Sequence, residues 1–543
     1  MKKMTKLLAL ILSIVMLAGV LCGCGGEKEV QTGGKFTYWV TMTGAASQTL
    51  TSYGDMLMYQ EMAKATGTEV EFIHPASGST GTEAFQILLS SGNYPDMIEY
   101  GWKSYAGGPD QAINDGVIIS LNDYLEDYAP NYYSYMYGEK GKENGYLYNA
   151  QSISDAGNHY GFKNLNIGTY RGFGGIYIRK DMLDKWGLDV PVTIDDWDTV
   201  LKTAKENGIK APLTGGNGLF SITGSNFFNT AWQVGKSFYV DGNKIKFGPF
   251  QKNYRKYVEK MAEWMKEGYI DPDYITNASD NILGYMTNGS SIASTGFVGS
   301  GLGKLLPAMA EKDPNYSVVA CPYPVMKDGD IPWFQEVQPE ANDASIAISY
   351  QCGAENEDRY KEAVKWCDYL YSDEGSVLKS FGIEGETFTI EKGEDGKEHY
   401  IYTDKIMDHE KIGAHSVEAA LWHFFRPSNS PGLNQHPDYL NGFYPYDEQK
   451  EAIKVWNEYI EEARKHVLPG LSYTGEEATN KANIEAKGRD NLDAAISNII
   501  LGKASIDTLD AAIKQAKKDG YSDLLKIQQT AYDRYLDVIK ESK

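Results

Sequence analysis

The sequence predicts an α/β fold built as several domains or as two large lobes. Three observations lead to this prediction. The chain has 543 residues, which is long for one ordinary domain. Its apolar fraction of 42% and charged fraction of 23% are those of a protein with a sizeable core. Strand-like and helix-like segments alternate from Lys35 onward, as they do where helices cover a parallel sheet.

The first unit reads as a β-α-β-α-β series. A strand is expected at Lys35–Thr41, a helix at Asp55–Thr66 and a second strand in TEVEFIH. A helix at Glu83–Ser90 and the strand-like YPDMIEY follow. Such a series is typical of a parallel sheet, whose ligands bind at the carboxyl ends of the strands.

The end of the third strand differs from an ordinary core strand. Met97 and Ile98 form a short apolar run, but Glu99, Tyr100 and Trp102 follow it at once beside the glycines of YAGG. Because this is the carboxyl end of a strand, we expect these side chains to form one wall of a ligand cleft.

A second unit begins near the strand Gly175–Arg179. Thr193 is expected to cap a helix that stops at Gly208. The segment SFYVDGNKIKFG reads as a hairpin, a helix follows at Tyr254–Glu267, and the strand-like SSIASTGFVG leads into a glycine-rich loop.

The remaining chain is predicted to be largely helical. A helix at Lys361–Leu370 buries one apolar face, and nearly everything from Glu476 onward has a helical pattern. An apolar stripe in the C-terminal part is expected to be core and consists of Leu492, Ala495, Ile496, Ile499 and Ile500.

The N-terminus has the pattern of a secretory signal. A basic start precedes an apolar stretch at Leu7–Val20 that is short for a membrane span. The following LCGC resembles the bacterial lipobox, which implies cleavage before Cys24 and lipid, including palmitate, attached to that residue. The alternative is an ordinary signal peptide with an incidental cysteine. Either reading places the body of the protein outside the cytoplasm.

Charge and motifs exclude several functions. The net charge is −22, and removal of three leader lysines makes it −25, which argues against nucleic acid and weakly against an anionic ligand. The glycine-rich GFVGSGLGKLL lacks the residues of a P-loop, and His409 and His415 are not spaced as zinc ligands on a helix. Paired acids such as Glu384 and Glu386 leave a glycosidase as an alternative. A Cys352–Cys367 disulfide is possible, but buried free thiols are expected.

Several segments in order resemble one known family. They are SSGNYPDMIEYG, IYIRKDMLDKWGLDVPVTIDDW, MAEWMKEGYIDPDY, WCDYLYSDEGSVLKSFGIEGETFTI and ILGKASIDTLDAAIKQAKKDGY. Through these segments the chain resembles family 1 of the extracellular solute-binding proteins of ABC importers. The closest match within the family is its long lipoprotein branch. The resemblance implies a two-lobed, type II periplasmic-binding-protein-like fold. Each lobe would be a mostly parallel sheet with flanking helices, and the discontinuous lobes would be joined by a hinge.

The resemblance also implies domain boundaries. The chain would cross between lobes near Gly175, near Asn342–Ser345 and near Arg426. The expected order is signal peptide 1–23, tether 24–34, N-terminal lobe 35–175, C-terminal lobe 176–343, a return to the N-terminal lobe at 344–425 and a helical return to the C-terminal lobe at 426–543.

Candidate ligand contacts follow from position and from the resemblance. Tyr100, Trp102 and Phe297 match aromatic cleft loops of the family. Further aromatic and basic candidates lie in polar or Gly/Pro-punctuated loops and are Phe228, Trp232, Trp333, Trp422 and Arg426. Glu99 and Asn226 are expected to bind sugar hydroxyls. An acidic oligosaccharide would use Arg426 or Arg171 as clamps.

The function implied is capture of a solute for import. An oligosaccharide or another small solute would bind between the lobes, close them by a hinge motion and be presented to two permease subunits. No cofactor, metal, catalytic residue or nucleic acid is expected, and the protein would be a monomer anchored by lipid on the extracellular face of the bacterial cell membrane. The alternatives are a secreted glycoside-processing enzyme and a surface adhesin or signalling lipoprotein on the same fold.

Overall fold

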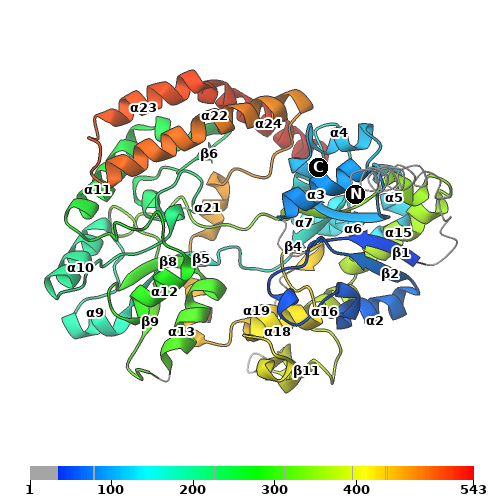
Figure 1. Ribbon diagram of the computed structural model, residues 1–543, viewed down its shortest axis with the longest axis horizontal. Helices are drawn as coiled ribbons and strands as arrows, with labels where there is room; N and C mark the ends of the chain where they lie inside the picture. The colour runs from blue at the N-terminus through cyan, green and yellow to red at the C-terminus, as the bar shows by residue number, and fades with distance from the viewer. Residues whose placement is uncertain are drawn as a thin grey trace, which may run out of the picture.

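The protein consists of two lobes that lie side by side along the long axis of the molecule (Figure 1). The structure, a computed structural model, describes residues 35–76, 80–225, 227–310, 312–393, 396–434, 436 and 438–543. The predicted signal peptide, Cys24 and the tether therefore lie outside the described residues. The two-lobed α/β fold expected from the sequence is confirmed.

The first lobe contains a six-stranded sheet in the order β13-β4-β10-β3-β1-β2. Its strands are β1 (Lys35–Trp39), β2 (Glu69–Ile73), β3 (Met97–Gly101), β4 (Phe162–Asn166), β10 (Ala341–Ile348) and β13 (Gly432–Asn434). β1 is parallel to β2 and β3, and β13 is parallel to β4. Only β10 runs against its neighbours β3 and β4, so this sheet is mostly parallel, as predicted.

Local sequence explains the first helices. α2 (Leu57–Thr66) ends at Gly67, whose φ of 66° is left-handed and suits glycine. α3 (Gly81–Ser91) begins with a capping box in which the Thr80 hydroxyl accepts from the Glu83 amide and the Glu83 carboxylate accepts from Thr80. The predicted β-α-β-α-β series is therefore present.

The second lobe corrects one detail of the expected fold. Its main sheet has the order β8-β5-β9, with β5 (Gly174–Arg179), β8 (Ala293–Phe297) and β9 (Val318–Cys321). β5 is antiparallel to both neighbours, so this sheet is not mostly parallel. The cause is connectivity: β5 runs away from the first lobe, whereas β8 and β9 run back toward it. The predicted hairpin is confirmed as β6 (Phe238–Asp241) and β7 (Lys244–Phe247).

Helices cover the sheets of both lobes (Figure 1). In the first lobe they include α4 (Gly108–Asn114), α5 (Asn122–Tyr128), α6 (Pro130–Met136), α7 (Glu139–Glu143), α8 (Leu147–Ser152), α14 (Tyr350–Gly353), α15 (Asp358–Asp368), α16 (Asp373–Ser380), α17 (Asp404–Met407), α18 (Val417–Phe424) and α19 (Tyr439–Phe443), beside a hairpin of β11 (Phe388–Lys392) and β12 (Glu398–Tyr402). In the second lobe they include α9 (Lys180–Trp186), α10 (Ile194–Glu206), α11 (Lys252–Lys266), α12 (Ser279–Thr287), α13 (Gly303–Ala310), α20 (Asp447–Asn457) and α21 (Ile460–His466).

The C-terminal helices lie over the second lobe and reach the first. α22 (Gly475–Ile500), α23 (Thr508–Ala516) and α24 (Ser522–Glu541) run across the top of the view in Figure 1. α22 packs on α11. Four residues of the predicted apolar stripe are buried, namely Leu492, Ile496, Ile499 and Ile500, whereas Ala495 is only partly buried. α24 also packs on α8 of the first lobe, so the C-terminal segment spans both lobes.

Three segments connect the sheet of the first lobe with the second lobe. Residues 167–173 join β4 to β5, residues 322–340 join β9 to β10, and the third segment leads from β13 through α19 to α20. The start of β5 lies beside the predicted crossing near Gly175. β13 still pairs with β4 of the first sheet, so the chain leaves the first lobe later than the crossing expected near Arg426.

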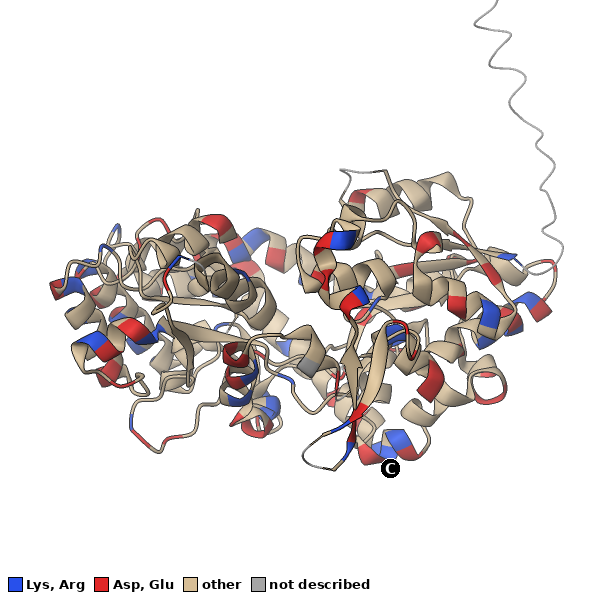
Figure 2. Cartoon of the chain, turned by 90° about the horizontal axis from the view of Figure 1, so that it is seen from below, with Lys and Arg blue, Asp and Glu red and all other residues tan. Residues whose placement is uncertain are grey.

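Other expectations concern surface charge, membranes and cysteines. Figure 2 shows acidic and basic residues interleaved over both lobes. Within the described ranges, no helix combines the length and the hydropathy needed to span a bilayer. Cys352 and Cys367 are free and buried, as is Cys321, so the expectation of buried thiols is confirmed.

Candidate ligand-binding cleft

The edge of the first sheet that faces the second lobe is defined by strand pairing. The carboxyl ends of the parallel strands β1, β2 and β3 lie together, because Trp39 pairs with both Ile73 and Ile98. β10 is antiparallel to β3, and its Ala344 pairs with Gly101 at the end of β3. The two connecting segments 167–173 and 322–340 leave from this same edge. It is therefore the hinge-side edge of the first lobe.

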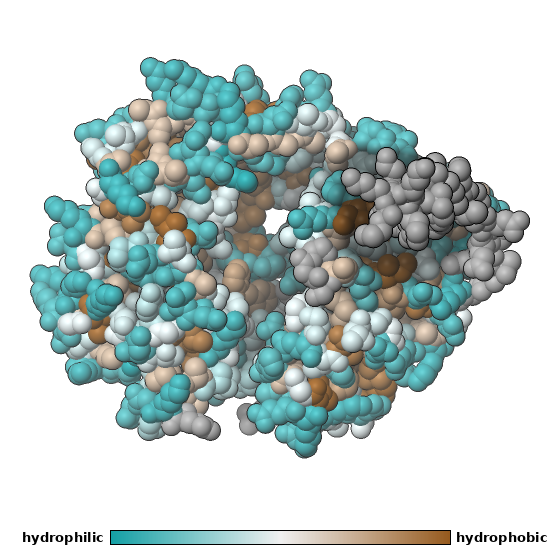
Figure 3. Space-filling view, in the orientation of Figure 1, coloured by the Kyte–Doolittle hydropathy of each residue, from teal (hydrophilic) through white to brown (hydrophobic). Residues whose placement is uncertain are grey.

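The second lobe presents a corresponding edge. Gly174, at the beginning of β5, pairs with Phe297 at the end of β8. Ile176 pairs with Cys321 at the end of β9. Because the connecting segments join the two edges, the edges face each other, and Figure 3 shows an opening between the lobes there. We take this opening as the candidate cleft.

Phe297 is the predicted ligand contact that the structure leaves most accessible. Its side chain is 42% exposed. A Cβ built on Gly174 would lie only 3.1 Å from the Phe297 ring, so the absence of a side chain at Gly174 lets the ring lie against the β5 backbone. The ring thus lies at the hinge-side edge with a face available to solvent.

The structure corrects the prediction that Trp102 forms a cleft wall. Trp102 is 0% exposed and belongs to a buried cluster with Trp39, Phe85 and Ile98. The ring packs edge-on against Phe85 at a centroid distance of 5.4 Å. The physical reason is the short helical turn at Trp102–Ser104, directly after β3. In this turn the Trp102 side chain packs between the sheet and the helices α3 and α4. Tyr100 is stacked on the same Phe85, 3.6 Å away, and is only partly exposed.

Glu99 and Arg426 form an internal ion pair instead of two ligand contacts. Two guanidinium nitrogens donate to the two carboxylate oxygens at 2.6 and 2.7 Å. Their side chains are 3% exposed for Arg426 and 9% for Glu99. The Tyr38 hydroxyl also donates to Glu99, and Arg426 donates to the Tyr59 hydroxyl at 3.1 Å. Burial opposes the charge of Arg426, but the carboxylate of Glu99 holds its pKa above the ordinary range. Neither group is available as a sugar partner or an acid clamp.

Three further candidates are packing residues in the described structure. Phe228 is 1% exposed, Trp422 is 5% exposed and Trp232 is 8% exposed. Phe228 lies edge-on to Trp197 and Trp264, with centroids 5.2 and 5.3 Å away. Trp232 packs on Tyr257 at a centroid distance of 5.7 Å. The candidates were chosen for their loop surroundings, but the fold buries all three.

Trp333 and Arg171 have partners within the protein. Trp333 is partly exposed and stacks on His466 of α21 at a centroid distance of 4.3 Å. Arg171 is 6% exposed and donates to the carbonyl of Asn166 at 2.6 Å. Asn226 lies outside the described residues.

Glu336 is a cleft residue that the sequence reasoning missed. Its carboxylate accepts hydrogen bonds from the Phe173 amide at 2.7 Å and from Nε2 of Gln338 at 2.6 Å. A Cβ on Gly174 would lie 3.5 Å from Cγ of Glu336, so Glu336 and Phe297 flank the same glycine. Burial raises the pKa of Glu336 to about 7 despite these hydrogen bonds. The signal in the sequence was weak, because Glu336 is one of three acids in the polar stretch WFQEVQPEAND before a lobe crossing.

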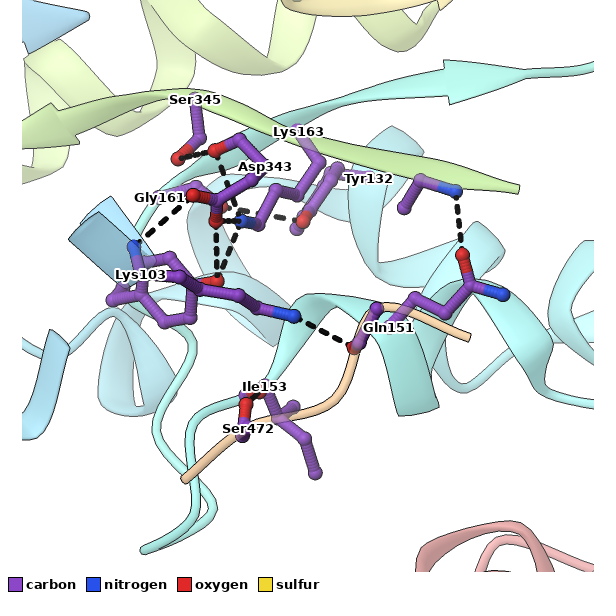
Figure 4. Close-up of polar contacts among 12 residues, drawn as sticks. Lys103, Tyr132, Gln151, Ile153, Gly161, Lys163, Asp343, Ser345 and Ser472 are labelled. Atoms are coloured by element: carbon purple, nitrogen blue, oxygen red, sulfur yellow. Dashed lines mark hydrogen bonds and ion pairs between the residues drawn. The ribbon is translucent and has the colours of Figure 1, made fainter. Parts of the chain in front are cut away.

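A second polar cluster lies at the first-lobe edge (Figure 4). Nζ of the fully buried Lys163 is 3.1 Å from Oδ1 of Asp343 and donates to the Tyr160 hydroxyl at 2.6 Å. Burial lowers the pKa of Lys163 to about 8, although Asp343 opposes the shift. The other Asp343 oxygen accepts from the Lys103 amide at 3.1 Å, and the Asp343 side chain keeps 30% exposure.

The cluster also binds the segment that precedes α22. Nζ of Lys103 donates to the carbonyl of Gly470 at 2.7 Å, and the Ser472 hydroxyl donates to the carbonyl of Ile153 at 2.7 Å (Figure 4). The amine of Lys103 is therefore engaged in holding the C-terminal segment against the first lobe. Among the described residues, no group of three or more His, Cys, Asp or Glu side chains is placed to hold a metal ion.

The fold and the opening define a bilobal ligand-binding protein. Two lobes, three connecting segments and two facing sheet edges form the arrangement that closes on a ligand by a hinge motion. Residues 47–377 match the sequence model of the family described as bacterial extracellular solute-binding protein. The chain belongs to this family, whose members are binding proteins rather than enzymes.

Named relatives and solved structures agree with this assignment. The chain is 23% identical over 534 residues to the fructooligosaccharide ABC transporter substrate-binding protein FusA of Streptococcus pneumoniae, covering 91% of this chain and 90% of FusA. It is 22% identical over 540 residues to lipoprotein LipO of Bacillus subtilis, covering 96% and 97% of the two chains. An HMO-binding solute-binding protein of Bifidobacterium longum infantis has the same fold, with a TM-score of 0.72, 18% identity and coverage of 93% and 99%.

Proposed function

We propose that the protein captures a carbohydrate between its lobes and delivers it to an ABC importer. The observation that carries the proposal is Phe297, a 42% exposed aromatic ring at the hinge-side edge of the cleft. Sugar rings present C–H faces that pack on aromatic rings, and their hydroxyls need polar partners nearby. Glu336 and Asp343 supply such partners at the two facing edges. The name of FusA, a fructooligosaccharide-binding relative of nearly equal length, supports the same ligand class.

Closure of the lobes is the proposed signal to the importer. A ligand that contacts both edges stabilises the closed arrangement, because the open arrangement lacks one set of contacts. The two closed lobes would then present a joint surface to the two permease subunits. The ligand is proposed to be an oligosaccharide, and the protein is proposed to act as a monomer.

The protein is further proposed to be anchored in the cell membrane by lipid on Cys24. The support is the lipobox-like LCGC that ends the apolar leader and the name of LipO, a lipoprotein aligned over 96% of this chain. More than one acyl chain is needed for stable anchoring, and lipoprotein processing supplies it. The acidic body would then remain at the extracellular face.

Calorimetry and small-angle scattering test this function together. The mature chain with Cys24→Ser is titrated with neutral oligosaccharides, among them fructo-, galacto- and cello-oligosaccharides, and scattering is recorded with and without each binder. We expect saturable binding and a smaller radius of gyration in the bound state. Each titrated sample is then searched for cleavage products, because turnover of the sugar would contradict a binding role. Binding without compaction would contradict the hinge mechanism.

A further inference from the structure

We propose that the cleft selects uncharged oligosaccharides over acidic ones, and that Glu336 sets this preference. The inference rests on the proposed function, since it concerns which carbohydrates the cleft accepts. It goes beyond that function because solute capture alone does not fix the charge of the ligand.

The first step is the position of the Glu336 carboxylate. Glu336 belongs to the segment 322–340 that joins the lobes. A Cβ built on Gly174 would lie 3.1 Å from the Phe297 ring and 3.5 Å from Cγ of Glu336, so both side chains border the same small space. A sugar stacked on the Phe297 ring would therefore bring its substituents close to this carboxyl group. Its side chain is partly exposed, so it is not sealed within the core.

The second step is the nature of the groups that hold the carboxylate. They are the Phe173 amide, the Gly174 amide and the Gln338 side-chain amide, all of which are uncharged. In the part of the chain that the structure describes, no Lys, Arg or His forms an ion pair with Glu336. Burial raises the pKa of Glu336 to about 7, so the group carries its full negative charge only above that pH. That charge is stabilised by dipoles alone, and a second negative charge nearby finds no compensating cation.

The third step concerns the cations that could have served as clamps for an acidic sugar. Arg426 is bound to Glu99 by two hydrogen bonds. Arg171 is nearly buried and bound to the Asn166 carbonyl, and Nζ of Lys103 is bound to the Gly470 carbonyl. Each of these groups would have to leave a protein partner to reach a ligand.

An exposed cation of the second lobe also has an acidic neighbour in the first lobe. Lys304 on α13 of the second lobe is exposed and interacts electrostatically with Glu418 on α18 of the first lobe. Asp343 keeps part of its carboxylate exposed although Lys163 is bound to it. The described carboxylates at the two edges can therefore accept hydrogen bonds from sugar hydroxyls. The described cations there are less able to pair with a sugar carboxylate, because each already has a protein partner.

The chemistry of the ligand then decides the preference. A sugar hydroxyl can donate to Glu336 in a charge-assisted hydrogen bond, which is stronger than a neutral one. A uronic acid in the same place brings a like charge into a site that is partly withdrawn from water, where charge repulsion is poorly screened. We expect the acidic sugar to bind about tenfold to 100-fold more weakly than its neutral counterpart.

The experiment compares matched sugars that differ only at C6. The Cys24→Ser mature chain is titrated at a pH of about 8.5, where Glu336 is ionised. The ligands are α-1,4-linked galactotetraose and tetragalacturonate, and cellotetraose and its C6-carboxylate. We expect the neutral member of a pair to bind at least about tenfold more tightly. In Glu336→Gln, the same size without the charge, the difference should shrink. The control Glu384→Gln removes an exposed acid of the first lobe that lies beside α2 and α16, and it should leave the difference unchanged.

The outcomes separate the two proposals. Equal or tighter binding of the acidic sugar by the unaltered cleft overturns the charge preference but leaves carbohydrate capture intact. An undiminished preference in a folded Glu336→Gln variant overturns the assignment to Glu336. Failure of both series and of the wider neutral panel overturns carbohydrate capture and the preference with it. The comparison of the matched sugars does not depend on any variant at Glu336, so a misfolded variant does not remove the test.

Discussion

Replacing Trp102 by alanine should destabilise the first lobe without removing a ligand contact. The indole is 0% exposed and packs in a cluster with Trp39, Phe85 and Ile98. Removing a fully buried Trp or Phe side chain typically costs about 3–5 kcal/mol in the free energy of unfolding. At about 2–4 °C per kcal/mol for a unit of this size, the melting temperature of the first lobe should fall by about 6 °C or more.

Phe297→Ala is the matched control, because it removes an aromatic ring that is 42% exposed. It should cost about 1 kcal/mol or less in stability, as most surface changes do. If the ring is a platform for sugar, affinity should fall about tenfold or more, which corresponds to about 1.4 kcal/mol. Trp102→Phe should lie between the unaltered protein and Trp102→Ala in stability, because it keeps an aromatic ring in the core. It breaks no hydrogen bond, since Nε1 of Trp102 has no partner among the described residues.

The assay combines denaturant unfolding with calorimetry at a temperature where all variants are folded. The expected pattern is loss of stability with retained affinity for Trp102→Ala, and the reverse for Phe297→Ala. If Trp102→Ala melts like the unaltered protein but loses binding, the indole reaches the ligand and the assignment to the core is wrong. If Phe297→Ala binds with full affinity, the exposed ring is not a platform.

Arg426→Met should cost about 3–5 kcal/mol of stability, because it leaves the buried Glu99 carboxylate unpaired. In denaturant melts, the double variant with Glu99→Gln should recover part of this loss. If the two losses simply add, the two side chains are not coupled. Burial raises the pKa of Glu336 from 4.5 to about 7, so between these pH values the folded state keeps a proton that the unfolded state has released. Stability should therefore fall as the pH rises from 4.5 toward 7, and Glu336→Gln should flatten this dependence in thermal melts. An unchanged pH dependence in the variant would assign it to other groups. Cys24→Ser should abolish labelling by a palmitate analogue and release the protein or leave it unprocessed; equal labelling of both proteins would place the lipid elsewhere.

Local sequence patterns predicted the beginning of the fold well. The first three strands and the two helices between them depend on short-range signals, such as the Thr80–Glu83 capping box and the left-handed Gly67 and Gly92. The antiparallel second sheet could not be predicted in the same way. Its pairs Gly174–Phe297 and Ile176–Cys321 join residues more than 100 positions apart. Strand direction there depends on the path of the whole chain, which short patterns do not contain.

The candidate site was predicted less completely, for a related reason. Trp102 and Phe297 have similar local surroundings, each at the end of a strand and next to glycines. What separates them is cover from distant parts of the chain: α3 and α4 bury Trp102, whereas Phe297 lies against Gly174, which has no side chain, and stays 42% exposed. Glu336 was missed because Phe173, which donates to its carboxylate, is 163 positions earlier.

The pairing of Glu99 with Arg426 shows that polar residues paired within the protein are not available to bind a ligand. These two side chains are 327 positions apart, and each looked suited to a sugar when considered alone. In the folded chain each satisfies the other, because a buried charge without a partner costs several kcal/mol of stability. Glu336 differs in that only uncharged amides hold it and part of its side chain remains open. When ionised, such a carboxyl group gains from a neutral hydroxyl donor and loses from a second carboxylate. The proposed preference for a neutral ligand therefore depends on which ion pairs the fold has already made.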